Sequence, residues 1–86
     1  MSQIHFKLSE TLEMIGATRN KIAVESKTRP ATILDLASGD TKTIKLETLV
    51  NILNAINQIA DSQGVEKKFG IEDIIQYIPE STENKR

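Results

Sequence analysis

The residue types that carry most enzyme chemistry are scarce in this chain. It has no cysteine, and His5 is its one histidine, so the residues for a thiolate metal site or for a Ser–His or Cys–His nucleophile pair are missing. Glu72 and Asp73 are adjacent, but neighbouring residues of a helix do not face the same way, and acids in a first helical turn are explained by the helix macrodipole. We therefore expect no enzyme, no cofactor and no metal site, with His5 on the surface.

The charged residues are unevenly distributed along the sequence. The net charge is −1, yet residues 18–45 hold six basic against three acidic residues, and residues 46–86 hold four against seven. A locally basic segment in a nearly neutral protein is the weak form of a nucleic-acid footprint, and a solvated mixed surface explains the same distribution equally well. Charge alone leaves both interpretations open.

Apolar spacing predicts the elements that would position these charges. Hydrophobic residues recur at intervals of three and four, the period of a helix with one buried face. Gly16, Pro30 and Gly39 separate successive segments, because glycine commonly ends a helix and proline is tolerated in its first turn. The predicted helices span residues 8–15, 18–26, 30–38, 46–62 and 71–78, and residues 1–7 are expected to be extended or loose. The expected fold class is all-α, a compact five-helix bundle forming one domain over residues 1–79, with a disordered polar tail over 80–86.

The last two predicted helices have the longest apolar patterns. The buried stripe expected for the fourth contains Leu46, Leu49, Val50, Leu53, Ile56 and Ala60. The fifth is predicted from isoleucines at helical spacing before Pro79, namely Ile71, Ile74, Ile75 and Ile78. Tyr77 lies among them, and this face is interpreted either as core or as a dimer seam, with the seam slightly favoured.

The short helices at 18–26 and 30–38 are the most informative pair. Two helices of about eight residues joined by a three- or four-residue turn make a helix-turn-helix. Thr18 is a suitable N-cap for the first, and the small Ala23 would let the two helices cross closely. Ile22, Ile33 and Leu36 are expected to fill the angle between them.

This segment resembles the Cro/lambda-repressor (XRE-type) family, and within it a small branch of bacterial and phage regulators. The resemblance lies in TRNKIAVESKTRPATILDLASGDTKTIKLETL, which follows the pattern T-R-x-K-[IL]-A, R-P-x-T-I-x-D-L and G-x-T-K-x-I-x-L-x-T-L. It extends over roughly residues 6–79, including the ending DIIQYIPE. The resemblance implies a DNA-binding transcriptional regulator such as a repressor, with the third helix in the major groove of double-stranded DNA.

The resemblance also implies roles for individual residues. Phosphate contacts would come from Thr18, Arg19, Asn20, Lys42 and Thr43. Base-facing positions would be held by Arg29, Pro30, Ala31, Thr32 and Asp35. These types suit the task, because arginine donates to guanine through two hydrogen bonds and aspartate accepts from cytosine. Small proteins of this kind often bind two-fold sites as dimers, so a homodimer is one expected state.

The sequence departs from the pattern at several positions. Lys27 and Thr28 replace a glycine and an apolar residue in the turn, so we expect backbone strain there and allow Lys27 a phosphate contact. Ala31 and Leu34 replace polar residues on the third helix. The alternative function is therefore a helix-turn-helix used to bind another protein, as an antirepressor or accessory subunit, through an exposed surface around Leu34. The expected dimer or partner contacts are Leu34, Ile74, Tyr77 and Ile78.

The amino-terminal residues MSQIHFKLSE do not have the basic-then-apolar pattern of a signal peptide. No apolar run approaches the roughly 20 residues that a membrane-spanning helix needs. We therefore expect a cytoplasmic protein without a membrane partner.

Overall fold

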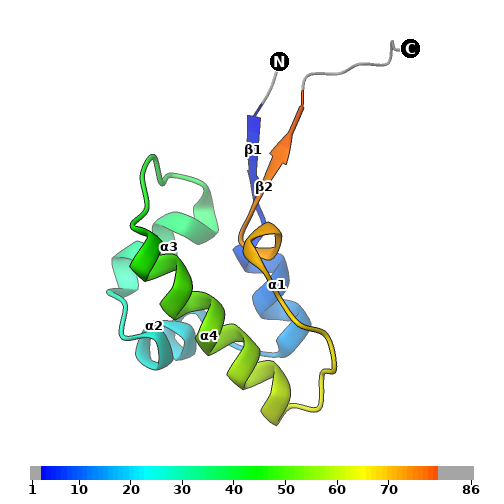
Figure 1. Cartoon of the computed structure of the whole chain (residues 1–86). Helices are drawn as coiled ribbons and strands as arrows, with labels where there is room; N and C mark the ends of the chain where they lie inside the picture. The colour runs from blue at the N-terminus through cyan, green and yellow to red at the C-terminus, as the bar shows by residue number, and fades with distance from the viewer. Residues whose placement is uncertain (1–2, 80–86) are drawn as a thin grey trace, which may run out of the picture.

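Four α-helices and a two-stranded antiparallel sheet make up residues 3–79, the part of the chain that the computed structural model describes (Figure 1). In chain order the elements are β1 (Gln3–Phe6), α1 (Leu8–Ile15), α2 (Arg19–Ser26), α3 (Pro30–Ser38), α4 (Leu46–Ser62), a single 3₁₀ turn η1 (Ile71–Asp73) and β2 (Ile75–Ile78). The expected disordered tail, 80–86, lies outside the described residues.

The four α-helices begin and end where their sequence signals predict. The Thr18 hydroxyl accepts a hydrogen bond from the Lys21 N–H at 3.0 Å and so caps the start of α2. Pro30 is the first residue of α3, where its missing N–H costs no helical hydrogen bond. Gly16 and Gly39 follow α1 and α3 with φ of 69° and 83°, left-handed values that glycine adopts without a Cβ clash.

The expectation of an all-α, five-helix bundle is wrong at its carboxyl end. Ile71–Asp73 form only a 3₁₀ turn, and Ile75–Ile78 form β2, which pairs with β1 in the register Gln3↔Ile78 to Phe6↔Ile75. Isoleucine is β-branched and favours strands, and a short apolar run does not distinguish helix from strand by spacing. The partner strand decides the outcome, and it comes from the opposite end of the sequence. The fold is a small mixed α/β one.

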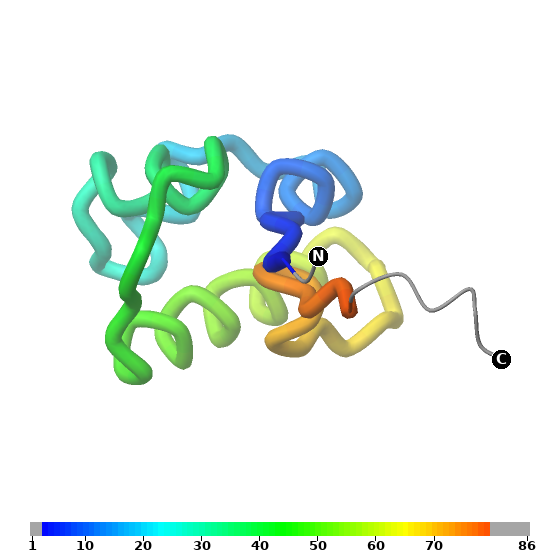
Figure 2. Tube along the Cα trace, turned by 90° about the horizontal axis from the view of Figure 1, so that it is seen from above, coloured from blue at the N-terminus to red at the C-terminus, as the bar shows by residue number. Residues whose placement is uncertain are grey.

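The core lies between α4 and the three preceding helices. Figure 2 shows α4 along one side of the molecule, with α1, α2 and α3 on the other. The largest side chains with almost no exposed surface are Leu8, Ile15, Ile22, Ile33, Leu36, Ile52, Ile56 and Ile74. The stripe predicted for α4 is wrong at its beginning, because Leu46 is 78% exposed and Val50 is 53% exposed. Leu46 and Val50 are four residues apart and share an exposed face of α4, whereas Leu49 between them is 5% exposed.

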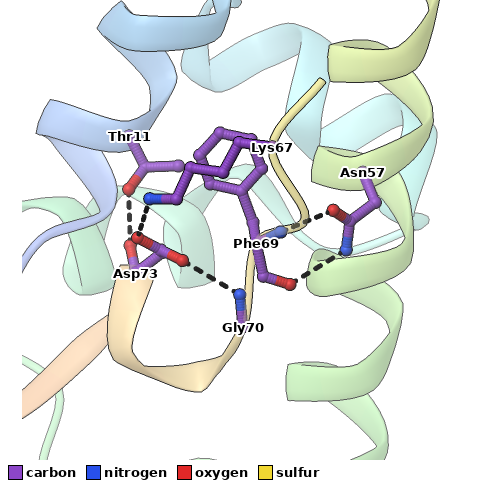
Figure 3. A network of polar contacts seen from close by, with 6 residues as sticks. All are labelled: Thr11, Asn57, Lys67, Phe69, Gly70 and Asp73. Atoms are coloured by element: carbon purple, nitrogen blue, oxygen red, sulfur yellow. Dashed lines mark hydrogen bonds and ion pairs between the residues drawn. The ribbon is translucent and has the colours of Figure 1, made fainter. Parts of the chain in front are cut away.

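Asp73 joins η1 to α1 through its main-chain carbonyl, and its buried carboxylate binds the segment that precedes η1 (Figure 3). Asp73 accepts hydrogen bonds from the Gly70 N–H at 2.9 Å and from Lys67 Nζ at 3.1 Å, and its carbonyl oxygen accepts one from the Thr11 hydroxyl at 2.6 Å. Burial raises the pKa of the Asp73 carboxyl, but the bond from Gly70 and the bond and charge of Lys67, with a smaller share from Lys7, outweigh it. The pKa of Asp73 therefore lies below its ordinary value, and the group is ionised at neutral pH.

An amide side chain fastens the same segment to α4. Asn57 donates to the Phe69 carbonyl at 3.0 Å and accepts from the Phe69 N–H at 2.8 Å (Figure 3). The ammonium of Lys67 lies 4.7 Å from the centroid of the Phe69 ring, within cation–π range. Lys67 therefore contributes to the fold through both Asp73 and Phe69.

Candidate nucleic-acid interface

The turn between α2 and α3 is held by local hydrogen bonds and one left-handed residue. Lys27 has φ 55° and ψ 39°, so the strained, non-glycine turn expected from the sequence is present. The Ser26 hydroxyl donates to the Ile22 carbonyl at 2.6 Å, and it lies 2.8 Å from the hydroxyl of Thr28. The Thr28 N–H donates to the Ala23 carbonyl at 2.9 Å. These bonds fix the path of the chain into α3.

The packing of α2 on α3 agrees with the sequence pattern. Ala23 is 3% exposed, and Ile22, Ile33 and Leu36 have no exposed surface. With these residues buried, one face of α3 points outward. That face comprises Pro30, Ala31, Leu34, Asp35 and Ser38, all exposed.

Two shallow hollows flank the outward face of α3. The first has a volume of about 380 Å³ and joins the start of α2 to α3; it is lined by Thr18, Arg19, Asn20, Pro30 and Leu34. The second has a volume of about 640 Å³ and joins the α2–α3 turn to the start of α4; its residues include Lys27, Arg29, Thr32, Thr43 and Lys45. Nine of the DNA- or partner-contacting residues predicted from the sequence therefore line these two hollows, on either side of α3, and Lys45 joins them.

The cations around α3 are exposed and unpaired. Among the described residues, ion pairs join Lys21 to Glu25 and Lys67 to Asp73, and His5 Nε2 lies 3.6 Å from a Glu10 carboxylate oxygen. The cations of the segment 18–45 that form none of these pairs are Arg19, Lys27, Arg29, Lys42 and Lys45. No carboxylate of residues 3–79 forms an ion pair with these five cations, although Glu47 lines the larger hollow beside Lys27, Arg29 and Lys45. The cluster keeps an excess of positive charge that a polyanion can contact.

Some predicted site residues lie away from the two hollows. Lys42 lines a separate groove beside the sheet. Asp35 is exposed on α3 and introduces a negative charge into the outward face. Leu34, by contrast, lines the first hollow and is 48% exposed, as a partner-binding residue would need to be.

The carboxyl-terminal face that was expected to form a dimer seam is only partly exposed to solvent. Ile74 has no exposed surface, so its assignment to a dimer or partner contact is wrong; it turns into the core below β2. Tyr77 is 62% exposed and Ile78 is half-buried.

Residues at the start of α4 were missed by the sequence interpretation. Lys45, Thr48 and Asn51 line the larger hollow together with Lys27 and Arg29. Their spacing of three places them on one helical face, and this polar face beside an apolar stripe was the available signal. The sequence did not show that the face borders the α2–α3 turn.

Two absences concern the part of the chain that the structure describes. Within residues 3–79, no three His, Cys, Asp or Glu side chains are grouped as a metal site requires. No helix in the same range is long and apolar enough to cross a membrane.

Comparisons of the chain with protein-family models, with curated proteins and with solved structures found no match.

Proposed function

We propose that this chain is a cytoplasmic DNA-binding transcriptional regulator of the Cro/lambda-repressor type, which inserts α3 into the major groove. The observation that carries the proposal is a set of five exposed cations around a short helix with an outward face, none of which forms an ion pair within residues 3–79. Cations flanking a helix can reach the phosphates on both sides of a groove while the helix approaches the base edges.

The residues divide into backbone-positioning and base-reading groups. Arg19 at the start of α2, Lys27 and Lys45 in the larger hollow, and Lys42 in the loop between α3 and α4 suit phosphate contacts, which give affinity without sequence information. Arg29 immediately precedes α3 and is the one base-facing residue able to donate two hydrogen bonds to guanine. Sequence discrimination therefore depends mainly on Arg29, with methyl contacts from Ala31 and Thr32.

The test is to titrate the full chain into a labelled, short random-sequence duplex at several salt concentrations and to measure binding by fluorescence anisotropy. Each phosphate contact contributes about 0.9 to the slope of log K against log salt, so losing one weakens binding about eightfold at about 0.1 M salt. Arg19→Ala and Lys45→Ala should each show this loss on every duplex. The matched control is Lys68→Ala, an exposed lysine in the loop after α4, at the far end of the molecule from α3 (Figure 2).

Equal losses in the control and the test variants would contradict the assignment of Arg19 and Lys45 to phosphates. Wild-type protein that shows no salt-dependent binding to any duplex would contradict the proposed function.

A specific observation favours a second candidate, binding of another protein. Leu34 is 48% exposed in the hollow next to Pro30, Arg19 and Asn20, and an apolar side chain in a polar-rimmed hollow suits a protein contact. Leu34→Ser separates the two functions. It should leave non-specific DNA affinity unchanged under the first proposal, and abolish co-purification of a specific partner from source-cell extract under the second.

A further inference from the structure

An apolar groove lies beside the sheet, outside the two hollows that flank α3. It runs between the sheet and the loop from α3 to α4 and has a volume of about 350 Å³. Its apolar residues are Ile4, Phe6, Leu36, Ile44 and Ile75. Ile4 is 48% exposed, although it lies in a strand whose neighbour Phe6 packs against the core. At this groove, core side chains such as Leu36 are reached from the protein surface.

The polar residues of the groove come from one loop. Thr41, Lys42 and Thr43 line it. Among residues 3–79 no carboxylate pairs with Lys42, and the nearby Asp40 carboxylate accepts a hydrogen bond from the Ser38 hydroxyl at 3.2 Å without lining the groove. An ammonium and two hydroxyls beside five apolar side chains are complementary to a molecule with an anionic head and an apolar tail.

The size of the groove favours a small molecule over a protein partner. Its volume is at the lower end of the range of about 300–1,000 Å³ seen for ligand pockets. At about 30 Å³ for each water-sized group, it has room for roughly ten non-hydrogen atoms. A carboxylate with a short aliphatic chain has this size and this distribution of charge.

We propose that the groove binds a small amphipathic carboxylate, with its chain against the five apolar residues and its head at Lys42, and that its occupation weakens DNA binding. The second part rests on the proposed function. Thr43 and Ile44 line both this groove and the hollow that contains Lys27 and Arg29. A ligand whose head pairs with Lys42 therefore neutralises a cation assigned to a phosphate, in the loop that also forms one wall of the DNA-facing hollow.

The first experiment tests the site without DNA. Octanoate is titrated into the isotopically labelled full chain, and the amide shifts are followed by NMR, with octanol as the neutral control. Saturable shifts should be confined to residues of the groove. Lys42→Gln, and the change from octanoate to octanol, should each weaken binding about two- to fivefold, the range for a solvent-exposed ion pair; Lys68→Gln should change nothing.

Two outcomes would overturn the proposed site. Shifts that fail to saturate, or that spread over exposed apolar residues elsewhere such as Leu34 and Leu46, would mean adsorption rather than a site. Equal affinity for octanoate and octanol would remove the role of Lys42.

The second experiment tests the effect on DNA, at constant ionic strength. Saturating octanoate should weaken wild-type binding to a random-sequence duplex by up to about eightfold at about 0.1 M salt, the loss of one phosphate contact, and should leave the affinity of Lys42→Gln unchanged. An equal effect on both proteins would overturn the coupling. Wild-type protein that binds no DNA while octanoate still saturates the groove would refute the proposed function and the coupling, and leave the ligand site standing.

Discussion

Replacing Lys27 by glycine should make the protein more stable and a weaker DNA binder at the same time. Lys27 has φ 55° and ψ 39°, a left-handed conformation that costs a residue with a Cβ about 1–2 kcal/mol. Glycine removes this cost but adds about 0.4–1 kcal/mol of unfolded-state entropy that folding must overcome. The net expectation for Lys27→Gly is a gain of about 0.5–1 kcal/mol, or roughly 2–8 °C in Tm for a domain of this size.

Lys27→Ala is the matched control, because it removes the same ammonium while keeping a Cβ at the left-handed position. The main-chain bonds of the turn, including Lys27 N–H to the Val24 carbonyl at 3.2 Å, are available to both variants. Thermal unfolding followed by circular dichroism should therefore separate the two variants. DNA binding should not distinguish the two variants. Both should bind a random-sequence duplex about eightfold more weakly than the wild-type protein at about 0.1 M salt.

Two results would refute this reasoning separately. If Lys27→Ala is as stable as Lys27→Gly, the left-handed backbone at residue 27 carries no conformational strain. If both variants keep wild-type affinity for DNA, Lys27 does not contact a phosphate, and the larger hollow is not directed at the DNA backbone.

Three further predictions concern the buried network and the base-facing residue. Asp73→Asn should lower the free energy of unfolding by about 1 kcal/mol at pH 7, since charge-assisted hydrogen bonds are lost. The pKa of Asp73 in the folded protein lies below its ordinary value of 3.8. In urea unfolding, the stability difference between wild type and Asp73→Asn should therefore be complete above about pH 5 and shrink as the pH falls below about 4; a difference independent of pH would contradict this. Thr11→Val should cost about 1–3 kcal/mol, because it leaves the Asp73 carbonyl without the hydroxyl that donates to it at 2.6 Å; an unchanged Tm would show that another donor replaces it. Arg29→Ala should reduce discrimination at one base pair by about 1–3 kcal/mol in a competition assay with single-substitution duplexes, and an equal loss on all duplexes would make Arg29 a phosphate contact instead.

Local signals in the sequence were sufficient for the four α-helices, and insufficient for the ends of the chain. Thr18, Pro30 and Gly39 act within one turn of where they stand, so their effect can be read without a structure. The strand Ile75–Ile78 depends instead on pairing with Gln3–Phe6, a contact between segments at opposite ends of the described residues. No periodicity within either segment reports such a contact.

The same distinction applies to the candidate site. The exposure of Ala31 and Leu34 follows from helical geometry once Ile33 and Leu36 are assigned to the core. The separation of the cations into two groups on either side of α3, and the participation of Lys45, depend on how α4 packs against α2. The sequence shows a polar residue, Lys27, where the turn usually has glycine, but only the structure shows that Lys27 adopts a left-handed backbone conformation.

The pairing of β1 with β2 also sets an order of events during synthesis and folding. Residues 3–6 leave the ribosome long before their hydrogen-bonding partner, residues 75–78, is made. Closing a loop that spans nearly the whole described chain carries a larger entropy cost than any helix-to-helix contact in this fold, and contacts of this range slow folding. Throughout elongation Ile4 and Phe6 must therefore remain without the strand that pairs with them. The nascent helices can assemble first, and the sheet closes the structure only after translation has passed residue 78.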